Sequence, residues 1–278
     1  MFDQYFKLLN LYRKEPNYII KNYKNNSNIC YVFFSSQGIY NKPYDIEGMK
    51  NVFENKRYEW ERIALNKKIV RNCCKQIFIR DIGKELYQRG INEQINSIDK
   101  LIKFISDETE DMDVYLVGSS SGGYIAFIAS QLHNVKRVYS VGGLVNIGKL
   151  STYKETINRY HLDAKYIDAS TFINLNSWII HIYGLNNFQD VENTSLLKKQ
   201  KMKNNVIIPI DSEKHAPRPS GHILINLLTC KDSRLNKLSA RLKNKKYISE
   251  SLLSFCVGCG IRFTINYCKR ILIHEKGN

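Results

Sequence analysis

The residues best suited to chemistry in this chain form a G-x-S-x-G motif, Gly118-Ser-Ser120-Ser-Gly122. An apolar β-type run precedes the motif, and a second apolar run of helical character follows it as far as Ala129. A serine at a sharp turn from strand to helix can act as a nucleophile, and such a turn requires small neighbours. The motif therefore predicts that Ser120 is a nucleophile. A polar turn rich in glycine and serine between two core elements is the alternative interpretation.

A serine hydroxyl is a poor nucleophile near neutral pH, so Ser120 would need a histidine as its general base. His215 is the preferred candidate among the six histidines, because it lies in a loop after the β-type run 205–210. His222 is the main rival. His181 alternates within an apolar run and is most simply a sheet residue. No context supports the remaining histidines, which are His133, His161 and His274.

A carboxylate that fixes the tautomer of the histidine would complete the set. Asp190 is preferred, because it follows the β-type run 178–183 and should lie at the same sheet edge as Ser120. Asp190 could also be the N-cap of the helix that follows, and the two roles are compatible. The other candidates are Asp211, which is expected at a strand end, and Asp163 and Asp168.

Alternating strands and helices must position these residues. Apolar positions at steps of three and four predict a helix over 90–106 with Asn92 as its cap, and a second helix is expected over 191–202. The alternation predicts an α/β fold with a mostly parallel, doubly wound sheet flanked by helices. We expect one domain over 1–230, a cap at 144–175, and a basic helical C-terminal extension, 231–278, packed on the domain. The strands are expected at 29–34, 75–80, before Gly118, and at 136–141, 178–183 and 205–210.

With these residues the chain resembles the α/β-hydrolase superfamily, in its serine esterase and acyltransferase branch, over about residues 28–225. The resemblance is carried by the motif around Ser120, by Asp190 and by His215, which follow one another in the family's order of serine, acid and histidine. It implies an α/β-hydrolase-like fold. Short stretches, residues 33–38 and Lys214-His215, are also similar to bacterial surface-polysaccharide (capsule and glycan) biosynthesis members, whose relatives move or remove acetyl groups on sugars.

The same resemblance implies an oxyanion hole, because cleaving or forming an ester requires donors for the developing negative charge. The backbone N–H of Ser121, the residue after the nucleophile, is expected to be the first donor. The second should come from the loop after the first of the predicted strands, from Ser36 or Gln37. This loop departs from the His-Gly-Gly-Gly form of many esterases.

The chain is strongly basic, with 42 Lys and Arg against 26 Asp and Glu and a net charge of +16. This charge favours anionic substrates, acidic glycans or an anionic membrane surface, although a solvated basic surface without a partner explains it equally well. The segment 231–246 carries seven basic residues among three leucines. Such a helix can lie on a membrane, or it can face the core and leave its basic side in solvent.

Seven cysteines without framework spacing favour reduced thiols, so we expect a cytoplasmic protein, with contact at the inner membrane as an option. Neither a secretory signal pattern nor an apolar run of membrane-spanning length is present in the sequence. Cys256-Val-Gly-Cys259 is interpreted as a pair of buried cysteines and not as a zinc site. We expect no metal and no bound cofactor.

These patterns predict a serine-dependent acyl hydrolase or O-acetyltransferase that forms an acyl-enzyme and acts on a small molecule, a bacterial surface glycan or a glycan precursor. Acetyl-CoA is the acyl donor expected for transfer. The alternative is a non-catalytic partner in a glycan-assembly or secretion complex that docks through its basic extension. Nucleic-acid binding has only the charge behind it and no motif.

Overall fold

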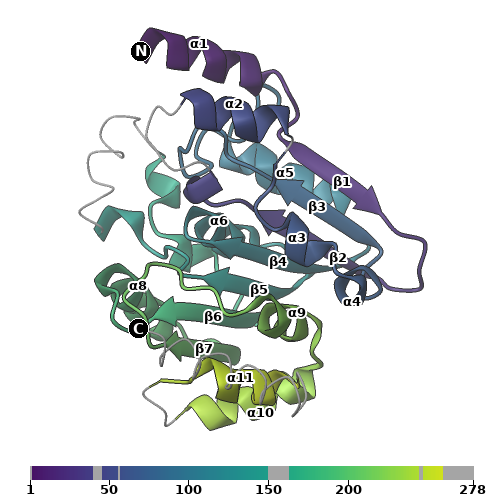
Figure 1. Cartoon of the computed structure of the whole chain (residues 1–278), viewed down its shortest axis with the longest axis vertical. Coiled ribbons are helices and arrows are strands. Elements are labelled where there is room, and N and C mark those ends of the chain that lie inside the picture. The colour runs from purple at the N-terminus through teal and green to yellow at the C-terminus, as the bar shows by residue number, and fades with distance from the viewer. Residues whose placement is uncertain (1, 40–45, 56, 150–162, 244–246, 259–278) are drawn as a thin grey trace, which may run out of the picture.

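The computed structural model describes residues 2–39, 46–55, 57–149, 163–243 and 247–258, which are built around a seven-stranded sheet (Figure 1). The strand order is β1-β3-β2-β4-β5-β6-β7. β1 pairs antiparallel with β3, and every other neighbouring pair is parallel. The strands are β1 (Tyr18–Asn22), β2 (Ile29–Phe34), β3 (Lys75–Ile79), β4 (Asp113–Ser119), β5 (Val135–Val141), β6 (Trp178–Gly184) and β7 (Asn204–Ile210).

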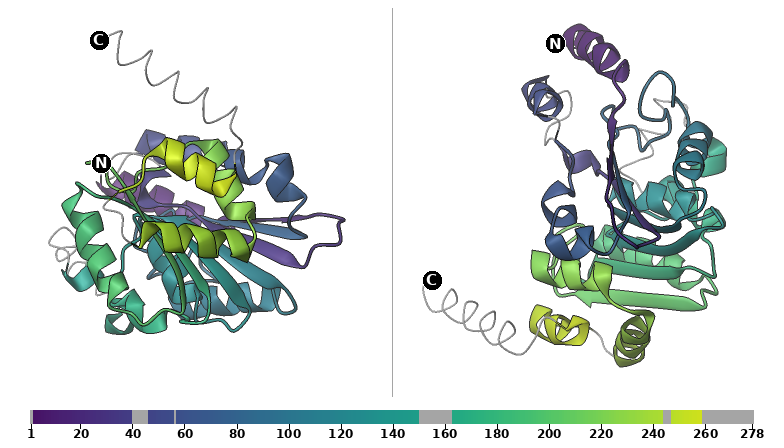
Figure 2. Two further views of the ribbon diagram at one scale, coloured as in Figure 1. Left: turned by 90° about the horizontal axis from the view of Figure 1, so that it is seen from below. Right: turned by 90° about the vertical axis from the view of Figure 1, so that its right-hand side faces the viewer.

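Helices cover both faces of the sheet (Figure 2). Buried side chains of α5, α6 and α8 belong to the core on one face, and those of α4, α9, α10 and α11 belong to the core on the other. α1 and α2 form a third cluster beyond the β1 edge (Figure 1). The helices are α1 (Phe2–Arg13), α2 (Ile46–Glu54), α3 (Glu61–Ala64), α4 (Lys67–Val70), α5 (Ile98–Glu108), α6 (Ser121–Ala129), α8 (Phe188–Lys198), α9 (Gly221–Thr229), α10 (Asp232–Leu242) and α11 (Glu250–Val257).

The central strands are buried on both faces, as strands between two helical layers must be. In β4, Leu116 belongs to the core on the α6 side and Val117 to the core on the opposite side, and Val32 and Phe33 of β2 alternate in the same way. This topology confirms the predicted fold class, an α/β-hydrolase-like, mostly parallel sheet flanked by helices.

The start of α5 differs from the sequence prediction. The helix begins at Ile98, with Ser97 as its N-cap, and the predicted cap at Asn92 is wrong. Asn92 instead closes a turn: its side-chain oxygen accepts the N–H groups of Gln94 and Ile95 at 3.0 and 2.6 Å. An asparagine binds nearby N–H groups in a turn as readily as at a helix start, so the pattern alone places the cap too early.

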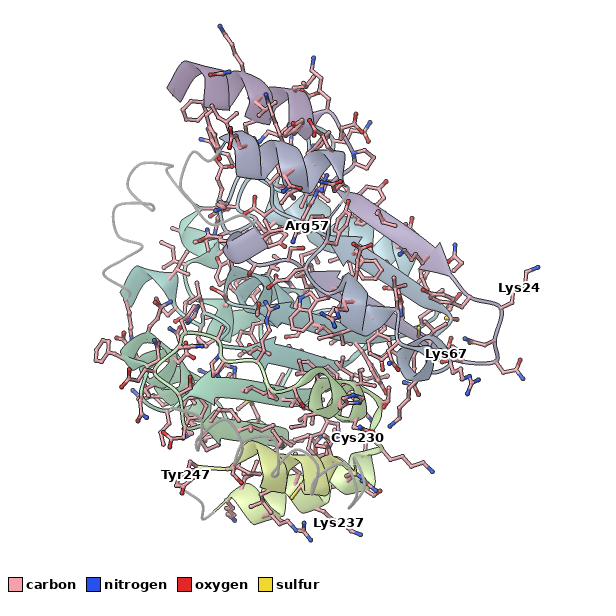
Figure 3. The ribbon with its side chains drawn as sticks, in the orientation of Figure 1. Lys24, Arg57, Lys67, Cys230, Lys237 and Tyr247 are labelled. Atoms are coloured by element: carbon pink, nitrogen blue, oxygen red, sulfur yellow. The ribbon has the colours of Figure 1, made fainter. Side chains whose placement is uncertain are left out.

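The described part of the basic extension packs on the sheet. Leu235, Leu238 and Leu242 of α10 are buried in the core on the α9 side, and α10 contacts the edge strand β7. The basic side of α10 is solvated, and Lys237 extends away from the sheet (Figure 3). Residues 244–246 and 259–278, with Cys259 and His274, lie outside the described residues. None of the helices in the described ranges combines the length and apolarity that crossing a membrane requires.

The segment expected to form a cap is described in two pieces, 144–149 and 163–175. Both belong to the core on the α6 side, through residues such as Val145 and Tyr166, and a bridge between Asn146 and Asp168 joins them. Three short 3-10 helices, η2 (Ile147–Lys149), η3 (Ala164–Tyr166) and η4 (Ala169–Phe172), make up most of the two pieces. Residues 150–162 lie outside the described part of the chain, so the cap stays a prediction.

Candidate active site

Ser120 occupies the turn between β4 and α6, at the carboxyl end of the parallel strands. Its φ of 49° and ψ of −118° are strained for a residue with a side chain, and its N–H donates to the Val141 carbonyl at 2.9 Å. The turn is tight: a Cβ on Gly118 would lie 2.1 Å from the Gly122 carbonyl oxygen. The small residues of the motif are therefore required by the close approach of strand and helix, as in a nucleophile elbow.

His215 and Asp190 lie in line with Ser120. His215 Nε2 is 2.8 Å from Ser120 Oγ, and His215 Nδ1 is 2.5 Å from Asp190 Oδ1. His215 comes from the loop after β7 and Asp190 from the first turn of α8, after β6. The structure thus joins three residues that are far apart in the sequence into one chain of hydrogen bonds.

Asp190 is held by backbone donors as well as by the histidine. Its side chain is fully buried, and Oδ2 accepts the N–H groups of Gly184 at 2.8 Å and Ala216 at 3.1 Å. Asp190 is not the helix cap that the sequence allowed, because Asn187 caps α8 and accepts the Asp190 N–H. The second carboxylate oxygen is thereby fixed, which leaves Oδ1 for His215.

The rival histidines lie in other settings. His181 is a buried residue of β6, between the hydroxyls of Ser140 and Thr194 at 3.1 Å each, and burial lowers its pKa to about 4. It is a neutral structural residue, as the sequence indicated. His222 lies in the first turn of α9, and His133 is exposed after α6. His161 lies outside the described residues.

The rival carboxylates have structural contacts. Asp163 and Asp168 cap the short helices η3 and η4. Asp211 is exposed and accepts a hydrogen bond from the Asn186 side chain at 2.7 Å. Among these acids, Asp190 is the one that contacts His215.

The predicted oxyanion loop lies against the start of α6. Ser121 is in the first turn of α6, and the N–H groups of a first helical turn have no carbonyl partner within the helix. Gln37 N–H donates to Ser121 Oγ at 2.9 Å, and the Gln37 side chain donates to the Lys84 carbonyl at 2.6 Å. Ser36 N–H instead donates to the carboxylate of Glu59. The loop is therefore beside the elbow as expected, but its two N–H groups have different partners.

An ion pair that the sequence did not predict lies on the flank of the elbow. Arg218 pairs with Glu59 and donates to Ser119 Oγ at 2.7 Å, and its guanidinium lies 4.8 Å from the Trp60 ring centre. Partial burial lowers the pKa of Arg218, whose side chain is 38% exposed, and the guanidinium stays charged. Because Arg218 follows His215 by three residues, the sequence alone could have indicated that Arg218 lies near the site. Nothing in the sequence links Glu59 to the elbow, because the contact is tertiary.

Metal chemistry has no candidate in the described part of the chain: no group of three or more His, Cys, Asp or Glu side chains there could hold an ion. A hydroxyl on a strained turn, a histidine base and a buried acid suit nucleophilic attack on a carbonyl group.

The sequence matches no family model and no curated protein. In structure the chain is similar to a capsule O-acetyltransferase of Neisseria meningitidis serogroup A, with 13% identity, a TM-score of 0.47, and coverage of 72% of this chain and 85% of that chain. It is also similar to an alpha-beta serine hydrolase homologue from Coxiella burnetii, with 13% identity, a TM-score of 0.44, and coverage of 76% of this chain and 89% of that chain. A third similar structure is esterase B from Lactobacillus rhamnosis, with 11% identity, a TM-score of 0.43, and coverage of 87% of this chain and 95% of that chain. At this level of identity the similarity concerns the fold alone.

Proposed function

We propose that the protein is a serine-dependent acyl hydrolase or O-acyltransferase that works through an acyl-enzyme. Ser120 is the nucleophile, His215 the general base and Asp190 the acid that orients the base. The observation that carries the proposal is the unbroken line of hydrogen bonds from Asp190 through His215 to Ser120 at a strained turn. Such a line is what activation of a serine hydroxyl requires.

The hydrogen bonds support one direction of proton transfer. A carboxylate can only accept, so His215 Nδ1 carries a proton for Asp190, and Nε2 presents its lone pair to Ser120. Ser120 Oγ attacks the substrate carbonyl carbon while its proton passes to Nε2. The tetrahedral intermediate collapses as the imidazolium returns that proton to the leaving group. Water or an acceptor hydroxyl then attacks the acyl-enzyme by the same route and releases Ser120.

Two backbone groups are proposed to stabilise the oxyanion. The Ser121 N–H is the first, because it lies at the amino end of α6, where the helix leaves such groups unpaired. We assign the second to the Gln37 N–H, because it contacts Ser121 directly. The Ser36 N–H is the weaker candidate, because it donates to the charged carboxylate of Glu59, whereas the Gln37 N–H donates to a neutral hydroxyl.

The proposed substrates are acyl esters or thioesters, with a surface glycan or its precursor as the target of transfer or removal. The net charge of +16 favours an anionic acyl donor or acceptor, and acetyl-CoA has that character. Acetyl-CoA releases its free thiol whichever acceptor takes the acetyl group, so the acetate formed and the acetyl groups gained by an added polysaccharide are measured together with the thiol to distinguish water from a sugar hydroxyl.

We further propose that the protein works in the cytoplasm and that its basic extension makes any contact with the inner membrane by charge. The leucines of α10 are buried in the core, so they are not available for insertion. Sedimentation with anionic vesicles should then be abolished by salt within the range that screens surface charges.

Labelling with a fluorophosphonate tests the proposed function. Wild-type protein should be labelled, and Ser120→Ala should not. His215→Ala should lose labelling, while His222→Ala, a matched change in the first turn of α9, should keep it. Folded wild-type protein that resists labelling would favour the non-catalytic partner.

A further inference from the structure

We propose that Glu59 is a positioning residue that holds the oxyanion loop in register with the nucleophile elbow and the base loop. The inference rests on the proposed function, because the loop matters only if an oxyanion forms beside Ser120. Glu59 lies in the segment before α3, away in sequence from each of the parts that it joins.

The first set of contacts ties Glu59 to the loop after β2. Its carboxylate accepts both the N–H and, at 3.0 Å, the hydroxyl of Ser36. Its own N–H donates to Ser35 Oγ at 3.3 Å, and the neighbouring Trp60 donates from its indole to the Phe34 carbonyl at 2.9 Å. Residues 59 and 60 therefore hold the loop from its start as far as Ser36, directly before the proposed donor of Gln37.

The second set ties the same carboxylate to the other two parts of the site. Glu59 Oε1 accepts the hydroxyl of Ser119, the residue before the nucleophile, at 3.0 Å. Arg218 pairs with Glu59 and also donates to Ser119 Oγ. Because Arg218 is three residues after His215, one carboxylate connects the segments that carry the oxyanion donor, the nucleophile and the base.

Burial explains why the carboxylate can impose this geometry. The Glu59 side chain is only 10% exposed, and that of Arg218 is 38% exposed. A desolvated carboxylate must keep its donors, because losing one leaves a charge without a partner. The Ser36 N–H, the Ser119 hydroxyl and Arg218 are therefore held in place together. If Ser36 turned away, the next peptide, which carries the Gln37 N–H, would leave Ser121.

The expected effect is on the transition state and not on substrate binding. Glu59→Gln keeps the shape but replaces one acceptor oxygen with an amide nitrogen, and Glu59→Ala removes every side-chain contact. Losing one oxyanion donor typically slows a reaction about 10²–10³-fold, so misplacing it should cost roughly 10-fold in Glu59→Gln and about 10²-fold in Glu59→Ala. KM should change little, because the carboxylate contacts the loop and not the substrate.

The experiment compares the full-length wild-type protein with Glu59→Gln, Glu59→Ala and the control Asp232→Asn. Asp232 is the partner of the buried Arg137, near the amino end of β5, away from the site. Hydrolysis of 4-nitrophenyl acetate gives kcat and KM. The burst of nitrophenol counts the competent active sites, and a trifluoromethyl ketone of the same acyl chain measures affinity for a transition-state analogue.

The inference predicts full burst amplitude in both Glu59 variants, with a fall in kcat and a parallel loss of affinity for the ketone. The plateau of the pH profile should fall while its acid limb stays in place. Asp232→Asn should keep the wild-type kcat. A reduced burst with unchanged constants per site would mean that Glu59 only supports folding, and wild-type constants in both variants would also overturn the inference. If the wild-type protein itself shows no burst and no labelling, it is the proposed function that fails.

Discussion

Replacing Asp190 with asparagine perturbs the proposed mechanism without removing volume. Oδ2 of Asp190 accepts the N–H groups of Gly184 and Ala216, so the amide oxygen of the asparagine must occupy that side. The amide nitrogen then faces His215 Nδ1, where it can only donate. The imidazole is forced into the tautomer with its proton on Nε2, which faces Ser120 Oγ and can no longer accept a proton.

The size of the effect follows from this change of tautomer. The variant retains Ser120, the oxyanion donors and the fold but has no base. A wrong tautomer of this kind lowers kcat by about 10⁴-fold, which corresponds to roughly 5 kcal/mol of transition-state stabilisation. The free energy of unfolding should change much less, because the asparagine side chain keeps the two backbone hydrogen bonds to its oxygen.

The rate of fluorophosphonate labelling measures the effect, with the thermal midpoint as a check on folding. Asp211→Asn is the matched control: it changes an exposed carboxylate near the same sheet edge that binds Asn186 and not His215. The reasoning is refuted if folded Asp190→Asn keeps a labelling rate within about tenfold of the wild-type protein, or if Asp211→Asn loses as much, since the expected ratio is near 10⁴.

Two further predictions concern residues that support the site. Gly118→Ala should abolish labelling and lower the thermal midpoint, because its Cβ would lie 2.1 Å from the Gly122 carbonyl oxygen, whereas Gly221→Ala, with no atom within 4 Å of the added Cβ, should be neutral by both measurements. The pKa of the buried His181 is about 4 in the folded protein and about 6.5 in the unfolded chain. Between these two pH values the unfolded chain binds more protons than the folded protein, so the free energy of unfolding falls as the pH is lowered. The loss should reach roughly 3 kcal/mol by pH 4, and His181→Gln should flatten this part of the curve in urea titrations from pH 7 to 4. Burial raises the pKa of Asp81 to about 7, so its protonation stabilises the folded state as the pH is lowered, and this effect is the same in the wild-type protein and in His181→Gln. An equal slope of stability against pH in the two proteins would therefore contradict the assignment to His181.

Much of the fold could be predicted because the local signals agree with the tertiary structure. The β-type runs before Ser35, Gly118 and Gly184 are buried strands, since a parallel sheet between two helical layers requires continuous apolar runs. The elbow could be predicted from its small residues, because strand and helix approach too closely for a side chain at Gly118.

Other features depend on partners that no local pattern contains. None of the strands predicted from the sequence lies before residue 29, and β1 is a strand because β3 supplies its antiparallel partner. Asn92 is of a residue type that often caps helices, but its side-chain oxygen accepts N–H groups of its own turn instead. Glu59 could not be found for the same reason: its contacts to Ser36, Ser119 and Arg218 form only when distant segments meet.

The most direct test of the central claim is to trap and locate the acyl-enzyme. The protein is mixed with 4-nitrophenyl acetate, quenched in acid and digested, and the acetylated peptide is sequenced by mass spectrometry. We expect one acetyl group per chain, on Ser120, in the wild-type protein and none in Ser120→Ala or His215→Ala. An acetyl group on another residue at equal yield in all three proteins, or no acetyl group on folded wild-type protein that turns over the ester, would contradict the account.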